Sequence, residues 1–133
     1  MICKPDAVER GLVGEIIARF ERKQLSLVAL EQMSLDAGLL ARHYEEHIGK
    51  GFYPDLVAFM SRGSVVAMVV EGPGDTFAVV RSLMGVTNPK NAAPGTIRGD
   101  FGIDMTENLV HGSDGQESAM REISIFFPAL EGP

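Results

Sequence analysis

The chain has 133 residues, of which 45% are hydrophobic and 23% charged, values typical of one globular domain spanning residues 1–133. No apolar run is long enough to span a bilayer and no signal peptide opens the sequence, so we expect a cytoplasmic protein without a membrane partner. The net charge of −6, with no lysine- or arginine-rich run, disfavours binding to nucleic acid. The single cysteine, Cys3, excludes an internal disulfide.

The first half of the chain predicts strands and helices in alternation. Residues 1–4 are typical of the end of a strand that Pro5 stops, because proline cannot donate to a ladder. A helix with apolar residues at helical spacing follows over 8–20, with Asp6 as its expected cap. A loosely alternating strand is predicted over 25–35. Two helices separated by glycines follow between residues 36 and 60.

The second half of the chain continues this order. The uninterrupted apolar run over 65–70 predicts a strand buried on both faces, and a helix is expected over 76–84. No periodicity is visible from residue 85 to residue 107, and so long a loop in a compact domain is usually functional. A fourth strand over 109–111 and a closing helix over 116–127 complete the pattern.

The predicted order places one helix between the first two strands and another between the last two. This is the ferredoxin-like split βαβ pattern. We therefore expect an α+β fold, in which helices cover one four-stranded antiparallel sheet.

The strongest candidate for chemistry is His111, which ends a strand and is followed at once by a glycine. An imidazole is mostly neutral at pH 7, so it can serve as a nucleophile, a base or a metal ligand. Ser113 or Asp114 is expected to cap the next helix, and Glu122 on that helix could fix the tautomer of the ring. The alternative is a histidine packed at a strand end with both nitrogens satisfied.

Three cations suggest an anionic ligand. Lys4 lies at a strand end, Arg81 in a helix and Arg98 in the glycine-rich loop. Phosphoryl transfer depends mainly on charge neutralisation and alignment, which lysine and arginine supply. For each of these residues the alternative is a solvated surface charge. If the phosphate role is correct, replacing Lys4 or Arg98 by alanine should slow transfer far more than it destabilises the protein.

Two further features have competing interpretations. His43 and His47 have the spacing to share a zinc ion, but Tyr44 stands where a metalloprotease needs glutamate. We therefore interpret the pair as a solvated helix face and do not expect a zinc enzyme. Phe52 follows a glycine break, and its ring could stack on a nucleobase or anchor the helix pair in the core. Spacing does not separate these two roles.

Five segments distributed over the whole chain together resemble the nucleoside diphosphate kinases of bacteria. They are Lys4-Pro5-Asp6-Ala7-Val8, Gly14-Glu15-Ile16-Ile17, Thr87-Asn88-Pro89, the stretch from Pro94 to Phe101, and Asn108-Leu109-Val110-His111-Gly112-Ser113-Asp114. The last segment is highly specific to that family. The resemblance implies a ferredoxin-like fold and a homo-oligomer, either a tetramer or a hexamer.

The resemblance also implies a reaction. The terminal phosphate of ATP or another nucleoside triphosphate would pass to a nucleoside diphosphate in a Mg²⁺-dependent ping-pong exchange, with His111 as the phosphate carrier. Each candidate residue then has an implied role: phosphate binding for Lys4, Arg81, Thr87 and Arg98, ribose and phosphate contact for Asn108, base stacking for Phe52, and orientation of the nucleophile for Tyr44, Ser113 and Glu122. Magnesium would be carried mainly by the nucleotide's own phosphates.

Two rival functions stay open on the sequence. A regulatory module could bind nucleotide without turnover, and a phosphohistidine carrier could serve protein partners. The intact set of His111, Glu122, Lys4 and Arg98 argues against the first. The expected stacking role of Phe52 argues against the second.

Overall fold

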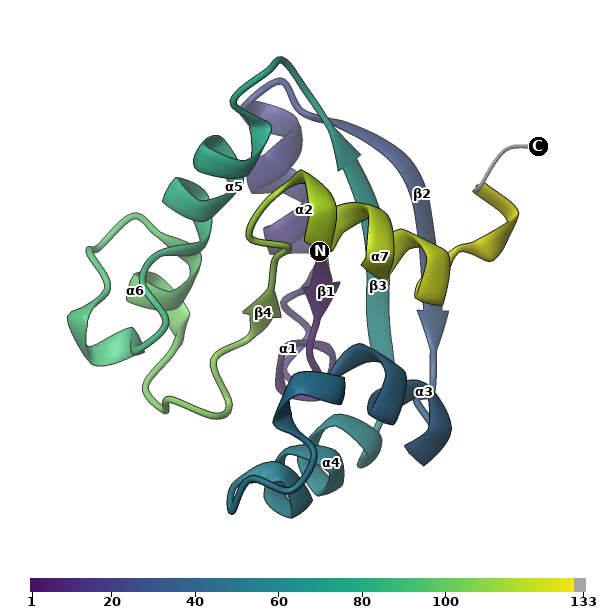
Figure 1. Cartoon of the computed structure of the whole chain (residues 1–133). Coiled ribbons are helices and arrows are strands. Elements are labelled where there is room, and N and C mark those ends of the chain that lie inside the picture. Colours follow the sequence, from purple (N-terminus) through teal and green to yellow (C-terminus); the bar gives the residue numbers. More distant parts are fainter. Residues whose placement is uncertain (131–133) are drawn as a thin grey trace.

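A four-stranded antiparallel sheet forms the centre of the molecule, which was obtained as a computed structural model that describes residues 1–130 (Figure 1). Its strands are β1 (Ile2–Cys3), β2 (Ser26–Met33), β3 (Val65–Glu71) and β4 (Val110–His111), in the spatial order β2-β3-β1-β4. Neighbouring strands all run antiparallel. This is the predicted ferredoxin-like arrangement.

Helices cover both faces of the sheet. They are α1 (Pro5–Glu9), α2 (Val13–Arg22), α3 (Ala37–His43), α4 (Tyr53–Ser61), α5 (Thr76–Met84), α6 (Ile97–Phe101) and α7 (Gln116–Phe126). Short 3₁₀ turns span Glu45–His47, Pro89–Asn91 and Pro128–Leu130. Within residues 1–130, none of these helices has the length and apolar character needed to cross a bilayer.

The period of two along the strands divides the core into two layers. Val66 and Met68 of β3 face α2 and α5, where Phe20 and Met84 are fully packed. The opposite face carries Ile2 and its neighbours under α3, α4 and α7; its buried members include Val65, Ala67, Leu40, Met60 and Phe126. Because Ile2 lies opposite His111 in the β1–β4 register, His111 faces the α3 and α7 layer.

The helix expected over 8–20 is in fact two helices. Gly11 has a φ of +69°, which ends α1 and lets α2 begin in a new direction. The expectation that Asp6 caps a helix is wrong, because Lys4 is the residue before α1 and has no side-chain cap. The Asp6 carboxylate instead accepts a hydrogen bond from the Leu109 amide at 3.1 Å and holds β1 to the segment before β4.

The segment 85–107 is not structureless, contrary to the sequence-based expectation. It contains the 3₁₀ turn Pro89–Asn91 and the five-residue helix α6, which Thr96 caps by accepting the Gly99 amide. A helix of so few residues is too short to show a period in the sequence. Its consequence for the site is that Arg98 belongs to a helix and is buried.

Candidate active site

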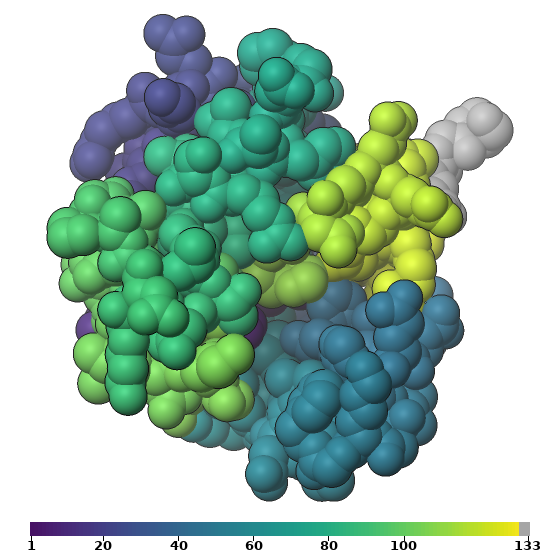
Figure 2. All heavy atoms as spheres, turned by 60° about the vertical axis from the view of Figure 1, so that its left-hand side comes forward, coloured from purple at the N-terminus to yellow at the C-terminus, as the bar shows by residue number. Residues whose placement is uncertain are grey.

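A cavity of about 760 Å³ opens at the end of β1 and β4. Figure 2 shows the hollow between the green segment that contains α5 and α6 and the blue α3–α4 pair, with α7 along one side. Most of the residues predicted from the sequence line it. They are Lys4, Tyr44, Arg81, Thr87, Arg98, Asn108, His111 and Glu122. The fold thus brings together side chains from both ends of the chain.

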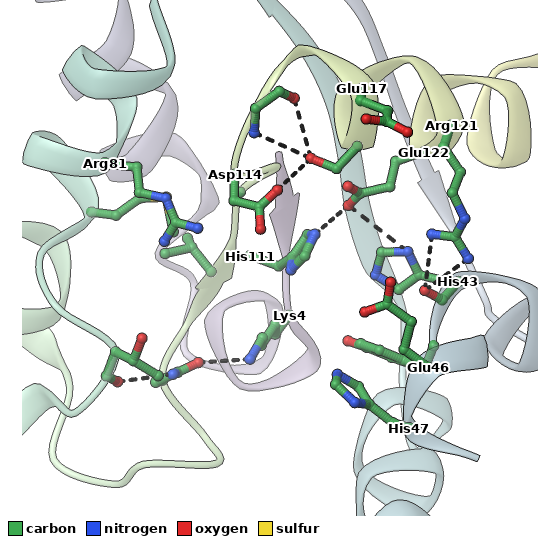
Figure 3. A pocket seen from close by; sticks show the side chains of 18 of the residues that line it. Lys4, His43, Glu46, His47, Arg81, His111, Asp114, Glu117, Arg121 and Glu122 are labelled. Atoms are coloured by element: carbon green, nitrogen blue, oxygen red, sulfur yellow. Dashed lines mark hydrogen bonds and ion pairs between the residues drawn. The ribbon is translucent and has the colours of Figure 1, made fainter.

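His111 is held by a carboxylate, as the sequence predicted. Its Nε2 is hydrogen-bonded to Oε1 of Glu122, which reaches it from α7 (Figure 3). The His111 side chain keeps 27% of its surface exposed, toward the cavity. Among residues 1–130, no side chain or backbone group makes a hydrogen bond to its other nitrogen, Nδ1. That nitrogen is available to a ligand.

The protonation states of this pair follow from their surroundings. Burial lowers the pKa of His111, although the hydrogen bond to Glu122 opposes the shift. Burial alone would raise the pKa of Glu122, but contact with His111 and His43 and a hydrogen bond from Ser113 hold that pKa below its usual value. A neutral imidazole therefore faces an ionised carboxylate near pH 7.

His43 overturns the interpretation of the 43–47 segment as a solvated helix face. It is 6% exposed, and its ring packs edge-on against that of His111 with centroids 4.8 Å apart. Its Nδ1 lies 3.9 Å from Oε1 of Glu122 (Figure 3). Burial and the neighbouring His111 lower the pKa of His43 to about 3, so this ring is neutral. His43 is thus a buried part of the site.

Lys4 begins a short chain of hydrogen bonds along the cavity. Its Nζ donates to Oδ1 of Asn108 at 2.6 Å, and Nδ2 of Asn108 donates to the Thr87 carbonyl at 3.0 Å. Burial, with a smaller contribution from Arg98, lowers the pKa of Lys4 to about 8. The pairing fixes the ammonium while leaving two of its protons for a ligand.

The two arginines differ in their surroundings. The Arg98 guanidinium is 4% exposed and donates to the carbonyls of Asn108 at 3.2 Å, Gly85 at 3.0 Å and Val110 at 2.6 Å. Burial, and secondarily Arg81, lowers the pKa of Arg98 to about 10. Arg81 is exposed, and among residues 1–130 it has no side-chain hydrogen bond or ion pair. Arg98 therefore joins three segments, while Arg81 is free to meet a ligand.

The remaining candidates lie around this centre. Tyr44 is buried against His43, with ring centroids 4.3 Å apart, and burial raises the pKa of its phenol. Ser113 does not line the main cavity but shares a smaller pocket with Glu122 on its other side. Phe52 is 51% exposed and stacks edge-on against His47, which lines the cavity. Phe52 is therefore a rim residue and not the core anchor that was its alternative.

The start of α7 also differs from expectation. Gly115, not Ser113 or Asp114, precedes the helix, and Asp114 accepts a hydrogen bond from the Ser118 hydroxyl at 2.6 Å. A Cβ at Gly112, directly after β4, would lie 2.6 Å from Sδ of Met84, so the glycine allows this end of the strand to pack against α5.

Sequence reasoning missed two residues of the site, His43 and Arg121. Arg121 donates to the backbone carbonyls of Arg42 and His43 and so fastens α7 to the end of α3. Helical spacing held the signal in both cases. His43 lies three residues after the buried Leu40, and Arg121 shares a face of α7 with its neighbours that line the cavity.

A reactive imidazole between a carboxylate and a set of cations, on a ferredoxin-like sheet, is suited to an enzyme that transfers phosphoryl groups. Comparisons with known proteins specify the class further. The family model for nucleoside diphosphate kinase matches residues 1–131. A nucleoside diphosphate kinase from Nocardioides is 55% identical over 130 residues, which are 98% of this chain and 96% of that protein. One from Thermus thermophilus is 56% identical over 127 residues, covering 96% and 92%.

Solved structures agree with these sequence comparisons. The structure of a halophilic nucleoside diphosphate kinase from Halobacterium salinarum in complex with CDP matches with a TM-score of 0.90 and 48% identity, over 95% of this chain and 84% of that one. The enzyme from Encephalitozoon cuniculi matches with a TM-score of 0.93 and 39% identity, over 99% and 89%. The chain belongs to the nucleoside diphosphate kinase family, and its function is that of a nucleoside diphosphate kinase.

Proposed function

We propose that the exchange runs through a phosphohistidine on His111, with Nδ1 as the attacking nitrogen. The observation that carries this is the hydrogen bond from Nε2 to Glu122, which places the ring proton on Nε2 and leaves the lone pair of Nδ1 facing the cavity. Attack forms the bond from Nδ1 to the terminal phosphorus and breaks the bond from that phosphorus to the bridging oxygen. The nucleoside diphosphate leaves, and a second one reverses the step.

Glu122 gives this step its electrostatic support. The imidazole acquires positive charge as it bonds to phosphorus, and the ionised carboxylate of Glu122 lies against the opposite nitrogen. The tautomer that Glu122 selects is also the reactive one. A single carboxylate thus orients the ring before the transfer and stabilises it during the transfer.

The opposite wall would receive the phosphates. Lys4 and Arg81 line the cavity with protons available to phosphate oxygens, and Arg98 adds positive charge from behind. The cavity also holds Asn108 and Thr87, suited to ribose and phosphate oxygens. Phe52 at the rim offers a face on which a base can stack without contacts to its edge. ATP and other nucleoside triphosphates, with the corresponding diphosphates, are therefore the proposed substrates, and the CDP complex of the halophilic relative supports this choice.

The donor atoms of the cavity fit magnesium that arrives with the nucleotide. Magnesium prefers six oxygen ligands and usually retains waters. Within residues 1–130, the closest group of possible metal ligands contains two imidazoles and one carboxylate, which is not an oxygen cage. Asp114 and Glu117 line the cavity and could hold water molecules of a phosphate-bound ion. Bound in this way, magnesium would neutralise charge on the phosphates.

Assembly and location also belong to the proposal. The family resemblance supports a homo-oligomer, either a tetramer or a hexamer, formed from copies of the single domain predicted over residues 1–133. Composition supports a cytoplasmic location and gives no support to a nucleic-acid partner, because the net charge is −6.

The test is transfer of label from terminally labelled ATP, with Mg²⁺, first to the purified protein and then to GDP. We expect an acid-labile, base-stable label that chases into GTP, and its complete loss in His111→Asn. The matched control is His47→Asn, which changes another histidine of the same cavity and should still accept label. Label on folded His111→Asn would contradict the proposal.

The same assay separates the rival functions. Nucleotide binding without label on the wild-type protein would indicate a regulatory module. A labelled protein that does not transfer to GDP would indicate a carrier for protein partners. Circular dichroism of each variant establishes that the fold is retained.

A further inference from the structure

His43 is a buried residue of the site whose two ring nitrogens both lack a hydrogen-bond partner among the residues that the structure describes. Its side chain is 2% exposed. Leaving a buried polar atom without a hydrogen-bond partner destabilises the folded state. Phosphoryl transfer as described above makes no use of these nitrogens, so they require another explanation.

His43 lies in a group with the composition of a transition-metal site. His43, His111 and Glu122 each offer one ligand atom, and these three atoms lie within 4.8 Å of one another. Both imidazoles lie close to the same carboxylate oxygen, Oε1 of Glu122. This oxygen contacts His111 Nε2 and lies 3.9 Å from His43 Nδ1. Figure 3 shows both rings directed toward this carboxylate.

The donor set favours zinc over magnesium. Two imidazoles with one carboxylate are the ligands of an open, catalytic-type zinc site, whereas magnesium prefers oxygen. Zinc bonds of about 2.0–2.1 Å require ligand atoms roughly 3.3 Å apart in tetrahedral geometry. The three ligand atoms lie within 4.8 Å of one another, and the His43–Glu122 separation exceeds the tetrahedral value by about 0.6 Å. The side chains must therefore draw together to hold the ion. The cavity leaves the fourth position open to water.

We propose that His43, His111 and Glu122 form an inhibitory site for zinc or a similar divalent transition-metal ion. The site is made from the catalytic histidine and its orienting carboxylate, together with a residue that the transfer reaction does not use. The inhibitory part of this inference rests on the proposed phosphohistidine mechanism. The binding part rests on the three side chains alone.

Inhibition follows from the position of one proton. Zinc bound to Nε2 of His111 takes the lone pair of that nitrogen, so the proton that Nε2 carried must move to Nδ1. The ring stays neutral and no net proton is released from it, but Nδ1 no longer has a lone pair for phosphorus. Glu122 exchanges its hydrogen bond for a bond to the metal. His43 enters as a neutral ligand, as the lowered pKa of its ring allows.

The first measurement is metal binding without nucleotide, by equilibrium dialysis with Zn²⁺ and by the visible absorption of Co²⁺ in tetrahedral coordination. We expect one ion per chain for the wild-type protein and for the control His47→Gln, which changes a histidine one helical turn away from His43. His43→Gln should bind at least tenfold more weakly. Equal affinity in His43→Gln, or no binding to the wild-type protein, would overturn the site. If His43→Gln does not fold, Glu122→Gln supplies the same comparison, because binding is measured without turnover.

The second measurement is labelling of His111 by ATP at constant Mg²⁺, with and without Zn²⁺. The ratio of the two rates is compared within each variant, so a changed basal rate cancels. We expect zinc to suppress labelling at least tenfold in the wild-type protein, a zinc-selective chelator to restore it, and His43→Gln to be largely resistant. Unchanged labelling at a zinc concentration that fills the site would overturn the inhibition. Absence of labelling without zinc would instead overturn the phosphohistidine mechanism and leave the binding result intact.

Discussion

The two walls of the cavity carry opposite charges. On one side of His111, Lys4 and Arg98 are positively charged groups that burial makes easier to deprotonate, and each is held by amide or carbonyl oxygens rather than by a carboxylate. On the other side, His43 is neutral and Glu122 carries the negative charge (Figure 3). Because neither cation forms an ion pair with a carboxylate among residues 1–130, their charge stays available to phosphate, while Glu122 acts on the ring.

The cation wall itself contains a second contrast. The Arg98 guanidinium donates hydrogen bonds to three backbone carbonyls, whereas Arg81 has no such partner within residues 1–130. The first arginine shapes the site from behind, and the second can move toward a ligand. Position in the same cavity therefore does not imply the same contribution to catalysis and stability.

The largest effect on the rate of labelling should come from changing Glu122, on the wall of the cavity opposite the cations. Glu122→Gln removes the charge and lets a side-chain amide donate to Nε2, which would hold the ring proton on Nδ1. We expect the rate of labelling to fall on the order of 10²–10⁴-fold, the range of a general acid–base contribution. Single-turnover labelling measures it. Glu117→Gln, on the same helix and also facing the cavity, should change the rate far less, and an equal loss in both variants would show that Glu122 acts only through general charge.

The arginine contrast predicts two different losses. Arg98→Ala removes three hydrogen bonds from a buried cation, so we expect a loss of about 3–5 kcal/mol in the free energy of unfolding. Arg81→Ala should leave that free energy within about 0.5 kcal/mol, as is usual at the surface, and slow transfer about 10- to 100-fold through one lost phosphate contact. Urea unfolding and turnover assays of both variants separate the two roles.

This pair of variants also revises an expectation from the sequence, that Arg98→Ala slows transfer far more than it destabilises. The structure predicts substantial destabilisation, because the partners of Arg98 are backbone carbonyls. If instead Arg98→Ala melts like the wild-type protein while Arg81→Ala does not, the assignment of the two arginines is reversed.

The sequence predicted the fold correctly where the period of the apolar residues matches the face that each element buries. The apolar run of β3 and the spacing of apolar residues in α2 are strong periodic signals, and four strands in the expected order follow from them. The prediction failed at Gly11, where one positive φ divides a helix without breaking its apolar period, and at α6, which is too short to show one. The first error concerns a helix boundary, which periodicity defines poorly, and the second is a helix that was missed altogether.

The sequence predicted the contacts of the site that join residues close together in the chain. His111 and Glu122 are eleven residues apart on a strand and the next helix, so the sequence itself implied their contact. His43 is 68 residues from His111, and only the packing of α3 under the sheet brings it to the site. Leu109 is a further case, because its φ is +76° and its amide donates a hydrogen bond to the distant Asp6. Such long-range pairings have no signature in a single sequence.

The smallest effect is a pH dependence that tests the buried state of Lys4. With its pKa lowered to about 8, the ammonium of the free enzyme is lost as pH rises through 8, so kcat/KM should fall about tenfold per pH unit above that value. Lys4→Arg should keep its charge and show no such fall. A flat profile for the wild-type protein up to pH 10 would contradict the lowered pKa of the buried Lys4 ammonium.

Above pH 8, where kcat/KM should fall, the free energy of unfolding should instead rise. Between pH 8 and 9 the unfolded chain still holds the Lys4 proton while the folded chain has released it, so the unfolded state binds more protons and the free energy of unfolding rises with pH. The contribution is up to about 1.4 kcal/mol per pH unit. This contribution should vanish in Lys4→Met, which removes the titrating group. The pH dependence that remains in this variant comes from the other titratable groups and is the reference for the wild-type protein. Opposite trends in activity and stability across one pH unit would show that the lysine is kept charged in the cavity for the ligand, at a cost to the fold.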